Sequence, residues 1–252
     1  MTADLKLALE LADLADSLSL PRFRAADLAV ETKANLTPVT DADRAVERAL
    51  RERLAAVRPE EAVLGEEEGG SEPAGSPARW ILDPIDGTKN FSRGIPIWAT
   101  LIALEREGVV VASAISAPAL GRRWWAARGE GSFADGLRIR VSRIAQIEEA
   151  VISFSPHVLH ERMRALLRSA WHKRTFSDFW QHALVAEGAV DAAIDPQLHA
   201  WDIAAVKLLV EEAGGRSTDL QGRDGLGTSL LSSNGLLHDA VLTAARPERH
   251  SR

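Results

Sequence analysis

Two carboxylates stand close together at the end of a short apolar run. Residues 80–82 predict a buried strand that leads into Asp83, and the proline that follows interrupts regular structure and turns the chain. Asp86 comes three residues after Asp83, so we expect both side chains on one tight bend. A small hard cation prefers carboxylate and carbonyl oxygens, and the backbone oxygen of Ile85 stands between the two acids. This spacing therefore points to a metal site.

The residues after the bend suggest an anion site beside the cation site. Gly87 and Thr88 can begin a helix whose free N–H groups favour a phosphate. Asp-Gly is also one of the commonest turn dipeptides, so Asp86 and Gly87 could form only a turn. A second acidic run, residues 65–70, follows another apolar segment and contains Glu66. An acidic run alone is usually a solvated loop, but two of them at strand ends favour a phosphate ester held on metal.

The spacing of the two aspartates argues against a covalent phosphatase mechanism. Haloacid-dehalogenase-type phosphatases carry Asp-x-Asp-Gly-Thr after a strand, with the first Asp as the nucleophile. Residues 83–88 read Asp-Pro-Ile-Asp-Gly-Thr, which places one more residue between the acids. The extra residue changes the direction of the second carboxylate, and this favours two metal ligands with water as the attacking group.

Several motifs together resemble those of the inositol monophosphatase family, the lithium-sensitive, magnesium-dependent phosphomonoesterases. The matching segments are residues 39–43 with Glu47, 65–67, 83–91, 201–205 and 212–215. The resemblance covers essentially the whole chain. It implies a mixed α+β and α/β fold, a layered αβαβα sandwich of the inositol monophosphatase and fructose-1,6-bisphosphatase type, and a small-molecule phosphate monoester as the substrate.

The resemblance also implies how the acids are used. Glu66, Asp83 and the Ile85 carbonyl would hold one Mg²⁺ with the attacking water, and Asp83, Asp86 and Asp202 would hold a second one beside the leaving oxygen. A third, looser Mg²⁺ near Glu66 is known in the family, so we expect two or three ions and inhibition by lithium. Asp202 would by itself also fit a plain N-cap of the helix that begins there.

Other residues are expected to orient the nucleophile and the phosphate. Asp43 matches the family aspartate that hydrogen-bonds the motif threonine, here Thr88, although Thr40 and Asp43 could also be only a helix N-cap pair. The backbone at Gly87 and Thr88 is expected to hold phosphate oxygens. Lys33 would face the phosphate if it acts as its family counterpart does, or would be a solvated surface lysine.

Composition narrows the class of protein. A chain of 252 residues with 46% hydrophobic residues can bury a substantial core, and the absence of cysteine excludes a disulfide framework, a thiolate zinc site and a cysteine nucleophile. The formal net charge of −6 argues against a nucleic-acid partner. No apolar run approaches the ~18 residues of a membrane span, and the N-terminus lacks a basic signal region. We therefore expect a cytoplasmic enzyme with no membrane partner.

Two halves are expected to enclose the cleft. Residues 1–145 would form an N-terminal α+β half with the metal and phosphate motifs, and residues 146–252 a C-terminal α/β half with the Trp-Asp motif and the specificity residues. The apolar patterns predict helices over residues 1–20, 40–54, 159–167 and 179–187 and, with one apolar face, from 201 to 213. They predict strands over residues 28–33, 98–104, 109–115, 123–127, 150–154 and 189–194.

The second half of the chain is expected to determine which substrate binds. Residues 97–104, 115–120, 122–126 and 184–191 look most like the bacterial histidinol-phosphate phosphatases of this family. Histidinol phosphate carries an ammonium group and an imidazole, and Asp178, Glu187 and Asp195 are acids in the region where the family binds the leaving group. Ser177, where those relatives usually have Gly, is the fourth expected substrate contact.

Alternatives from the same and from another class remain open. An inositol monophosphatase or broad-specificity phosphomonoesterase would bind inositol hydroxyls with Asp195 and the backbone around Ser177. A catalytically idle metal-binding scaffold is the alternative of another class. The seven histidines have no paired metal spacing, and we expect most of them at the surface or at helix caps, with His199 near Asp202 the one to watch. The family resemblance implies a homodimer.

Overall fold

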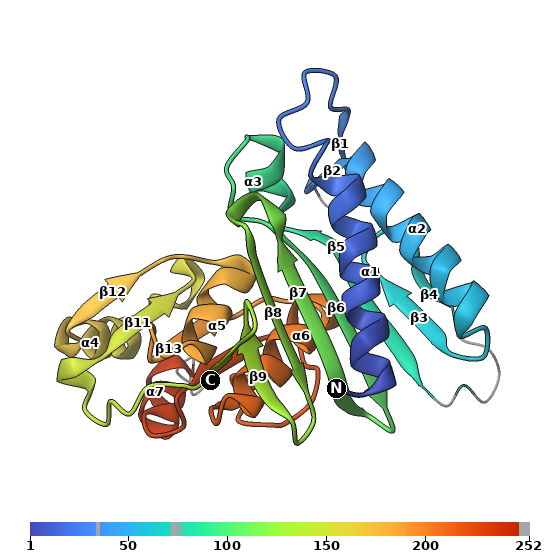
Figure 1. Ribbon diagram of the computed structural model, residues 1–252. Helices are drawn as coiled ribbons and strands as arrows, with labels where there is room; N and C mark the ends of the chain where they lie inside the picture. Colours follow the sequence, from blue (N-terminus) through green and yellow to red (C-terminus); the bar gives the residue numbers. More distant parts are fainter. Residues whose placement is uncertain (34–35, 72–75, 77, 247–252) are drawn as a thin grey trace, which may run out of the picture.

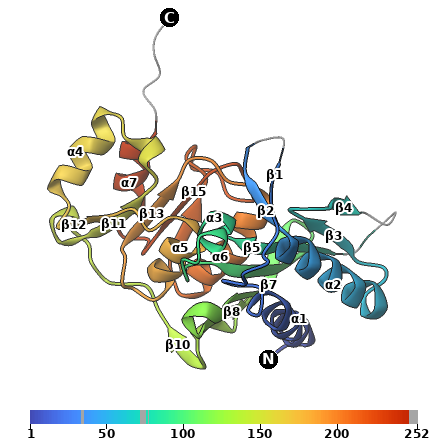
Figure 2. The same cartoon turned by 90° about the horizontal axis from the view of Figure 1, so that it is seen from above.

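The protein is built in five layers. The structure is a computed structural model that describes residues 1–33, 36–71, 76 and 78–246. A helix pair, an eight-stranded sheet, a second helix pair, a five-stranded sheet and a third helix pair lie one on another (Figures 1 and 2). The layered αβαβα sandwich implied by the family resemblance is confirmed.

The larger sheet runs in the order β10-β9-β8-β7-β6-β5-β3-β4. Its strands are β3 (Ala62–Gly65), β4 (Gly69–Ser71), β5 (Arg79–Asp86), β6 (Ala99–Arg106), β7 (Val109–Ala117), β8 (Arg122–Ala127), β9 (Gly131–Ala134) and β10 (Leu137–Ile139). Neighbours are antiparallel except β3 and β5, which run parallel. β5 is buried from its second residue to its last, because helices cover both faces of the sheet at this strand.

Two helices cover the outer face of this sheet, as Figure 1 shows. This region consists of α1 (Ala3–Ser19), β1 (Val30–Thr32), β2 (Pro38–Thr40) and α2 (Asp41–Val57). A capping box begins α2, because the Asp43 carboxylate accepts the backbone N–H of Thr40 at 2.8 Å while the Thr40 hydroxyl accepts the N–H of Asp43. The predicted N-cap pair is therefore present, and it fixes where the Asp43 side chain lies.

The middle layer contains α5 (Asp178–Ala186) and α6 (Ala200–Glu212). We predicted one apolar face for α6, but the structure buries every residue from 203 to 210, including Lys207. The reason is that α6 contacts strands of both sheets, so no side of its central turns faces water. α6 begins at the cleft and is held rigidly along its length, which positions its first turn.

The smaller sheet runs in the order β12-β11-β13-β15-β14, with β11 parallel to both of its neighbours. Its strands are β11 (Val151–Phe154), β12 (His172–Arg174), β13 (Ala192–Asp195), β14 (Arg216–Thr218) and β15 (Leu230–Ser233), and α4 (Glu161–Ser169) and α7 (His238–Ala245) form the last layer. The strand predicted over 189–194 begins only at Ala192. The preceding residues make the turn that ends α5, with Gly188 at φ +75°.

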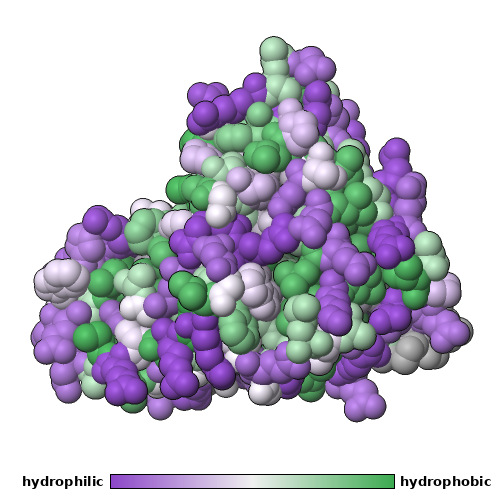
Figure 3. All heavy atoms as spheres, in the orientation of Figure 1, coloured by the Kyte–Doolittle hydropathy of each residue, from purple (hydrophilic) through white to green (hydrophobic). Residues whose placement is uncertain are grey.

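The remaining elements are short. They are α3 (Thr88–Ser92) and the 3₁₀ turns η1 (Pro118–Leu120), η2 (Ile147–Glu149) and η3 (Pro156–Val158). Polar and apolar side chains are interspersed over the face drawn in Figure 3. Among the described residues, no helix combines the length and the apolar character that crossing a membrane would need.

Candidate active site

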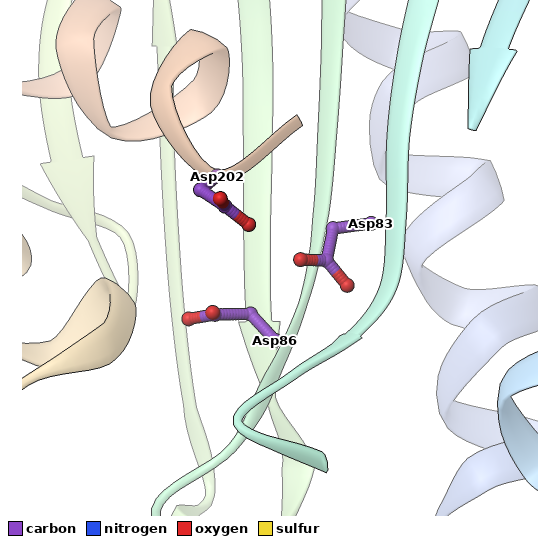
Figure 4. Close-up of side chains that lie close together, drawn as sticks. All are labelled: Asp83, Asp86 and Asp202. Carbon is purple, nitrogen blue, oxygen red and sulfur yellow. The ribbon is translucent and has the colours of Figure 1, made fainter. Parts of the chain in front are cut away.

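Two aspartates of β5 and one from the distant helix α6 converge at the end of β5 (Figure 4). Asp83 and Asp86 lie in the last residues of this strand, and Asp202 lies in the first turn of α6. One carboxylate oxygen of each lies within 4.8 Å of the others. In a regular strand, residues three apart point to opposite faces. The pairing of β5 with β6 shifts register between Asp83 and Asp86, and this irregularity lets both side chains enter the same space.

The cluster is electrostatically unfavourable by itself. Burial raises the pKa of Asp83 and of Asp86 well above the ordinary value, and the charges of neighbouring acids add to the effect. Burial likewise raises the pKa of Asp202 to about 6. Oδ1 of Asp83 is buried and has no hydrogen-bond partner in the part of the chain that the structure describes. An unpartnered carboxylate oxygen among further carboxylates fits a hard divalent cation such as Mg²⁺.

Asp202 takes part in a helix cap as well as in the cluster. The helix begins at Ala200, so Asp202 is not the N-cap residue, and the plain N-cap interpretation is wrong by position. Its carboxylate instead accepts the backbone N–H of His199 at 2.6 Å, within a capping box. The His199 ring is exposed and stacks on Trp201, with ring centroids 4.8 Å apart. The cap therefore orients the carboxylate that reaches the cluster.

Lys33 is not a solvated surface lysine. Its Nζ lies 2.9 Å from Oε1 of Glu66 and 2.5 Å from Oε1 of Glu67. Burial raises the pKa of Glu67 to about 7, against the opposing effect of the Lys33 hydrogen bond. Since Glu66 lines the cleft, Lys33 brings a positive charge to its acidic rim.

Glu47 supports the loop that carries Glu66. Its buried carboxylate accepts the backbone N–H of Glu67 at 2.7 Å and that of Glu68 at 2.9 Å. Gly65 makes this approach possible, because a Cβ there would lie 2.2 Å from a carboxylate oxygen of Glu47. The Gly-Glu-Glu sequence is thus explained by close packing as much as by charge.

Thr88 connects the metal motif with α2. Its hydroxyl lies 3.1 Å from Oδ1 of Asp43 and 3.0 Å from the carbonyl oxygen of Ile85. Burial raises the pKa of Asp43, whose other oxygen is held by Thr40. Gly87 has φ +86°, and a Cβ there would meet the Ile97 carbonyl at 3.1 Å, so glycine is required at this bend.

These residues line one cleft of about 450 Å³. Its lining includes Glu66, Asp83, Ile85, Asp86, Gly87, Thr88, Lys89, Asn90, Ser177, Asp178, His182, Asp195 and Asp202. Three of the four expected substrate contacts, Ser177, Asp178 and Asp195, are therefore in the cleft. Asp178 accepts hydrogen bonds from Asn90 and Ser177, both at 3.2 Å, and burial raises its pKa. Ser177 has φ +54°, a left-handed backbone conformation that favours glycine.

Glu187 does not belong to this group. Its carboxylate lies 2.7 Å from Arg122 and 2.5 Å from the indole N–H of Trp124, and it is not among the residues that line the cleft. The assignment of Glu187 as a substrate contact is therefore corrected. Asp178 and Glu187 stand at opposite ends of α5. Asp178 lines the cleft, whereas Glu187 contacts Arg122 and Trp124 of the larger sheet.

Sequence reasoning missed His182. We expected the histidines at the surface or at caps, but His182 is 2% exposed and lines the cleft beside Asp195. His238 is also buried, between Thr218 and Ser233. The apolar neighbours of His182 in α5 were the available signal, because a histidine within a buried helix must find polar partners inside the protein.

Comparison with known proteins agrees with this geometry. The model of the inositol monophosphatase family matches residues 2–250. A histidinol-phosphatase of Mycobacterium tuberculosis is 53% identical over 252 residues, which cover 95% of this chain and 96% of that protein. The crystal structure of the extragenic suppressor protein suhB from Bartonella henselae superposes with a TM-score of 0.90 at 31% identity, covering 98% of this chain and 100% of that chain. An IMPase/NADP phosphatase complexed with Mg²⁺ and phosphate superposes with a TM-score of 0.85 at 26% identity, covering 96% and 94%. The chain belongs to the inositol monophosphatase family and is a phosphoric monoester hydrolase.

Proposed function

We propose that this chain hydrolyses L-histidinol phosphate to L-histidinol and phosphate. The observation that carries the proposal is the charge of the cleft, since six acids and one lysine line it among the described residues. Asp178 and Asp195 stand beside the three-aspartate cluster but outside it, where the leaving alcohol would lie. A cationic alcohol such as histidinol fits these acids, whereas a bisphosphate would need further Lys or Arg side chains. The 53% identity to a histidinol-phosphatase supports the same substrate.

The metal-binding roles follow from the carboxylate and carbonyl oxygens that line the cleft. Glu66, Asp83 and the Ile85 carbonyl would hold one divalent ion, and Asp83, Asp86 and Asp202 a second. When bound, Mg²⁺ would activate a water for direct attack on phosphorus and would stabilise the leaving oxygen. The capping box at Asp202 and the support of Glu47 below Glu66 hold these carboxylates in place before substrate arrives. We expect two or three ions and inhibition by lithium.

Thr88 and Asp43 would orient the attacking water. The Thr88 hydroxyl has one proton and two neighbouring acceptors, Asp43 Oδ1 and the Ile85 carbonyl. Its proton is therefore used by one of these acceptors, and the oxygen keeps its lone pairs as acceptors for a water proton. Glu66, whose side chain lines the same cleft, would complete the catalytic group from the side of the first metal ion.

The phosphate would bind to the backbone N–H groups at Gly87 and Thr88, which follow the bend and line the cleft. Lys33 lies within 2.9 Å of Glu66 and would shift its ammonium toward the phosphate oxygens once a cation balances that acid. We further propose, on the family resemblance, a cytoplasmic homodimer. Size-exclusion chromatography with light scattering tests the dimer.

The substrate proposal is tested by comparing kcat/KM for L-histidinol phosphate and for inositol 1-phosphate with saturating Mg²⁺. We expect histidinol phosphate to be preferred by more than tenfold. A preference of that size for inositol phosphate would instead assign the chain as an inositol monophosphatase. Turnover should stop in excess chelator and return with Mg²⁺. Absence of turnover on every monoester tried would favour the metal-binding scaffold.

A further inference from the structure

His182 is a buried histidine of the cleft for which the hydrolysis scheme gives no task. It lies in α5, and its two ring nitrogens contact Asp195 of the cleft and Ser232 of the smaller sheet. Nε2 lies 3.2 Å from Oδ2 of Asp195, and Nδ1 lies 2.9 Å from the hydroxyl oxygen of Ser232. Ser232 belongs to β15, which pairs directly with the strand of Asp195.

The hydrogen bonds assign the tautomer of this ring. A carboxylate oxygen accepts, so Nε2 carries the proton that is donated to Asp195. The Ser232 hydroxyl can then donate to Nδ1, and the side chain of His182 is only 2% exposed, so both contacts lie inside the protein. His182 is therefore a fixed hydrogen-bond donor to Asp195.

Gln181 provides a second donor, its uncharged amide, to the same atom. Its side-chain nitrogen donates to Oδ2 of Asp195, and its side-chain oxygen accepts the hydroxyl of Ser153 at 2.7 Å, which fixes the orientation of the amide. Both donors therefore hold Oδ2. In the described part of the chain, Oδ1 of Asp195 accepts no hydrogen bond, and this oxygen remains available on the side of the cleft.

The two hydrogen bonds to Oδ2 hold the Asp195 carboxylate in one orientation. Glu187 shows the contrast within the same protein, because Arg122 pairs with it and cancels its charge. Among the described residues, no Lys or Arg forms an ion pair with Asp195, and the negative charges of Asp178 and Asp195 act on each other. A cleft built in this way favours a positive group on the ligand at Oδ1, and a primary ammonium is a compact point charge that suits one carboxylate oxygen.

We infer that His182, with Gln181, is a specificity-determining positioning residue that presents Asp195 to the ammonium group of the leaving alcohol. The inference rests on the proposed function, and it adds which residues select the amine and how. Ser232 completes the arrangement by fixing the tautomer of His182.

The test uses two substrates that differ only in the amine. These are L-histidinol phosphate and 3-(imidazol-4-yl)propyl phosphate, which keeps the imidazole and the phosphate. We expect the wild type to prefer the amine substrate by at least tenfold. His182→Leu should lower kcat/KM for the amine substrate about 10- to 100-fold, mainly through KM, since a hydrogen bond to a charged group is lost. The deaminated substrate should change less than about twofold, and His182→Gln, which keeps a donor, should recover most of the preference.

The matched control is His238→Leu, because His238 is also buried and also bonds two hydroxyl groups but is not among the cleft-lining residues. It should lower the melting temperature while the ratio between the two substrates stays at the wild-type value. If His182→Leu does not fold, Ser232→Ala should still lower the preference several-fold.

Two results would overturn the inference while leaving the proposed function intact. One is an equal loss on both substrates in His182→Leu, which is the behaviour of a purely structural residue. The other is a wild type that hydrolyses histidinol phosphate no better than the deaminated compound. A wild type that hydrolyses neither compound but turns over another monoester would overturn the proposed function together with the inference.

Discussion

The hydroxyl of Thr88 lies 3.1 Å from Oδ1 of Asp43, although 45 residues separate the two in the chain. This contact joins the turn after β5 to the first turn of α2. The second oxygen of Asp43 is held by the helix cap, so the position of Thr88 is set by the start of a helix in the outer layer. The Asp43 side chain therefore caps α2 with one oxygen and positions Thr88 of the cleft with the other.

Replacing either partner of this pair should slow the chemical step. We expect Thr88→Val and Asp43→Asn each to lower kcat about 100-fold at saturating Mg²⁺, with KM for histidinol phosphate changed little, because orientation of the water proton is lost. Steady-state kinetics measure both constants. Thr218→Val is the control, since Thr218 is buried in the smaller sheet, and a kcat within threefold of wild type for Thr88→Val would contradict the assigned role.

The metal-free protein should lose stability as the pH rises. The pKa of Asp202 is about 6 in the folded protein against an ordinary value of 3.8, so the folded state binds this proton more tightly than the unfolded chain. The stabilisation that this proton gives to the folded protein is complete below about pH 4 and is lost as the pH rises through about 6. The full difference in the free energy of unfolding corresponds to about 3 kcal/mol. Urea unfolding in chelator at pH 5 and pH 7.5 should show about half of this difference, roughly 1.4 kcal/mol, because the other half is already lost as the pH rises to 5.

Two additions make this pH experiment specific. Mg²⁺ should restore most of the stability at pH 7.5, because the cation stabilises the ionised carboxylates. Asp202→Asn in chelator should show a flatter dependence between the two pH values than the wild type. An unchanged slope in this variant would show that other groups cause the loss.

The loop that carries Glu66 should be sensitive to one methyl group. Gly65→Ala would place a Cβ 2.2 Å from the Glu47 carboxylate, so the loop or Glu47 must move. We expect the Mg²⁺ concentration for half-maximal activity to rise at least about tenfold, as for other losses of support behind a ligand. Gly70→Ala is the matched control, because its Cβ would meet only Leu64 at an ordinary 3.8 Å. A similar Mg²⁺ requirement in both variants would refute this support.

Glu187 should matter for stability and not for substrate binding. Glu187→Gln removes the charge that pairs with Arg122 at 2.7 Å, and we expect the free energy of unfolding to fall by roughly 1–2 kcal/mol. Its kcat/KM on histidinol phosphate should stay within about twofold of wild type. A tenfold rise in KM would return Glu187 to the substrate-binding residues.

The sequence by itself determined the local chemistry. Asp83, Asp86, Gly87 and Thr88 are neighbours in the chain, so the bend that they form follows from backbone sterics and turn preferences over a few residues. The capping box at Thr40 and the start of α6 near Asp202 are local in the same sense. Their element types could be predicted, although the start of β13 could not, since a glycine turn after α5 shifted it.

Tertiary structure alone decided which distant side chains share the cleft. Asp195 and Glu187 are both acids beside α5 in the sequence, yet one reaches the cleft and the other reaches Arg122, because the turn between them reverses the chain. His182 reaches Asp195 only because α5 packs against β13, and β15 brings Ser232 to the second ring nitrogen. Such contacts depend on the packing of sheets against helices, and a pattern read over a short window of sequence does not contain that information.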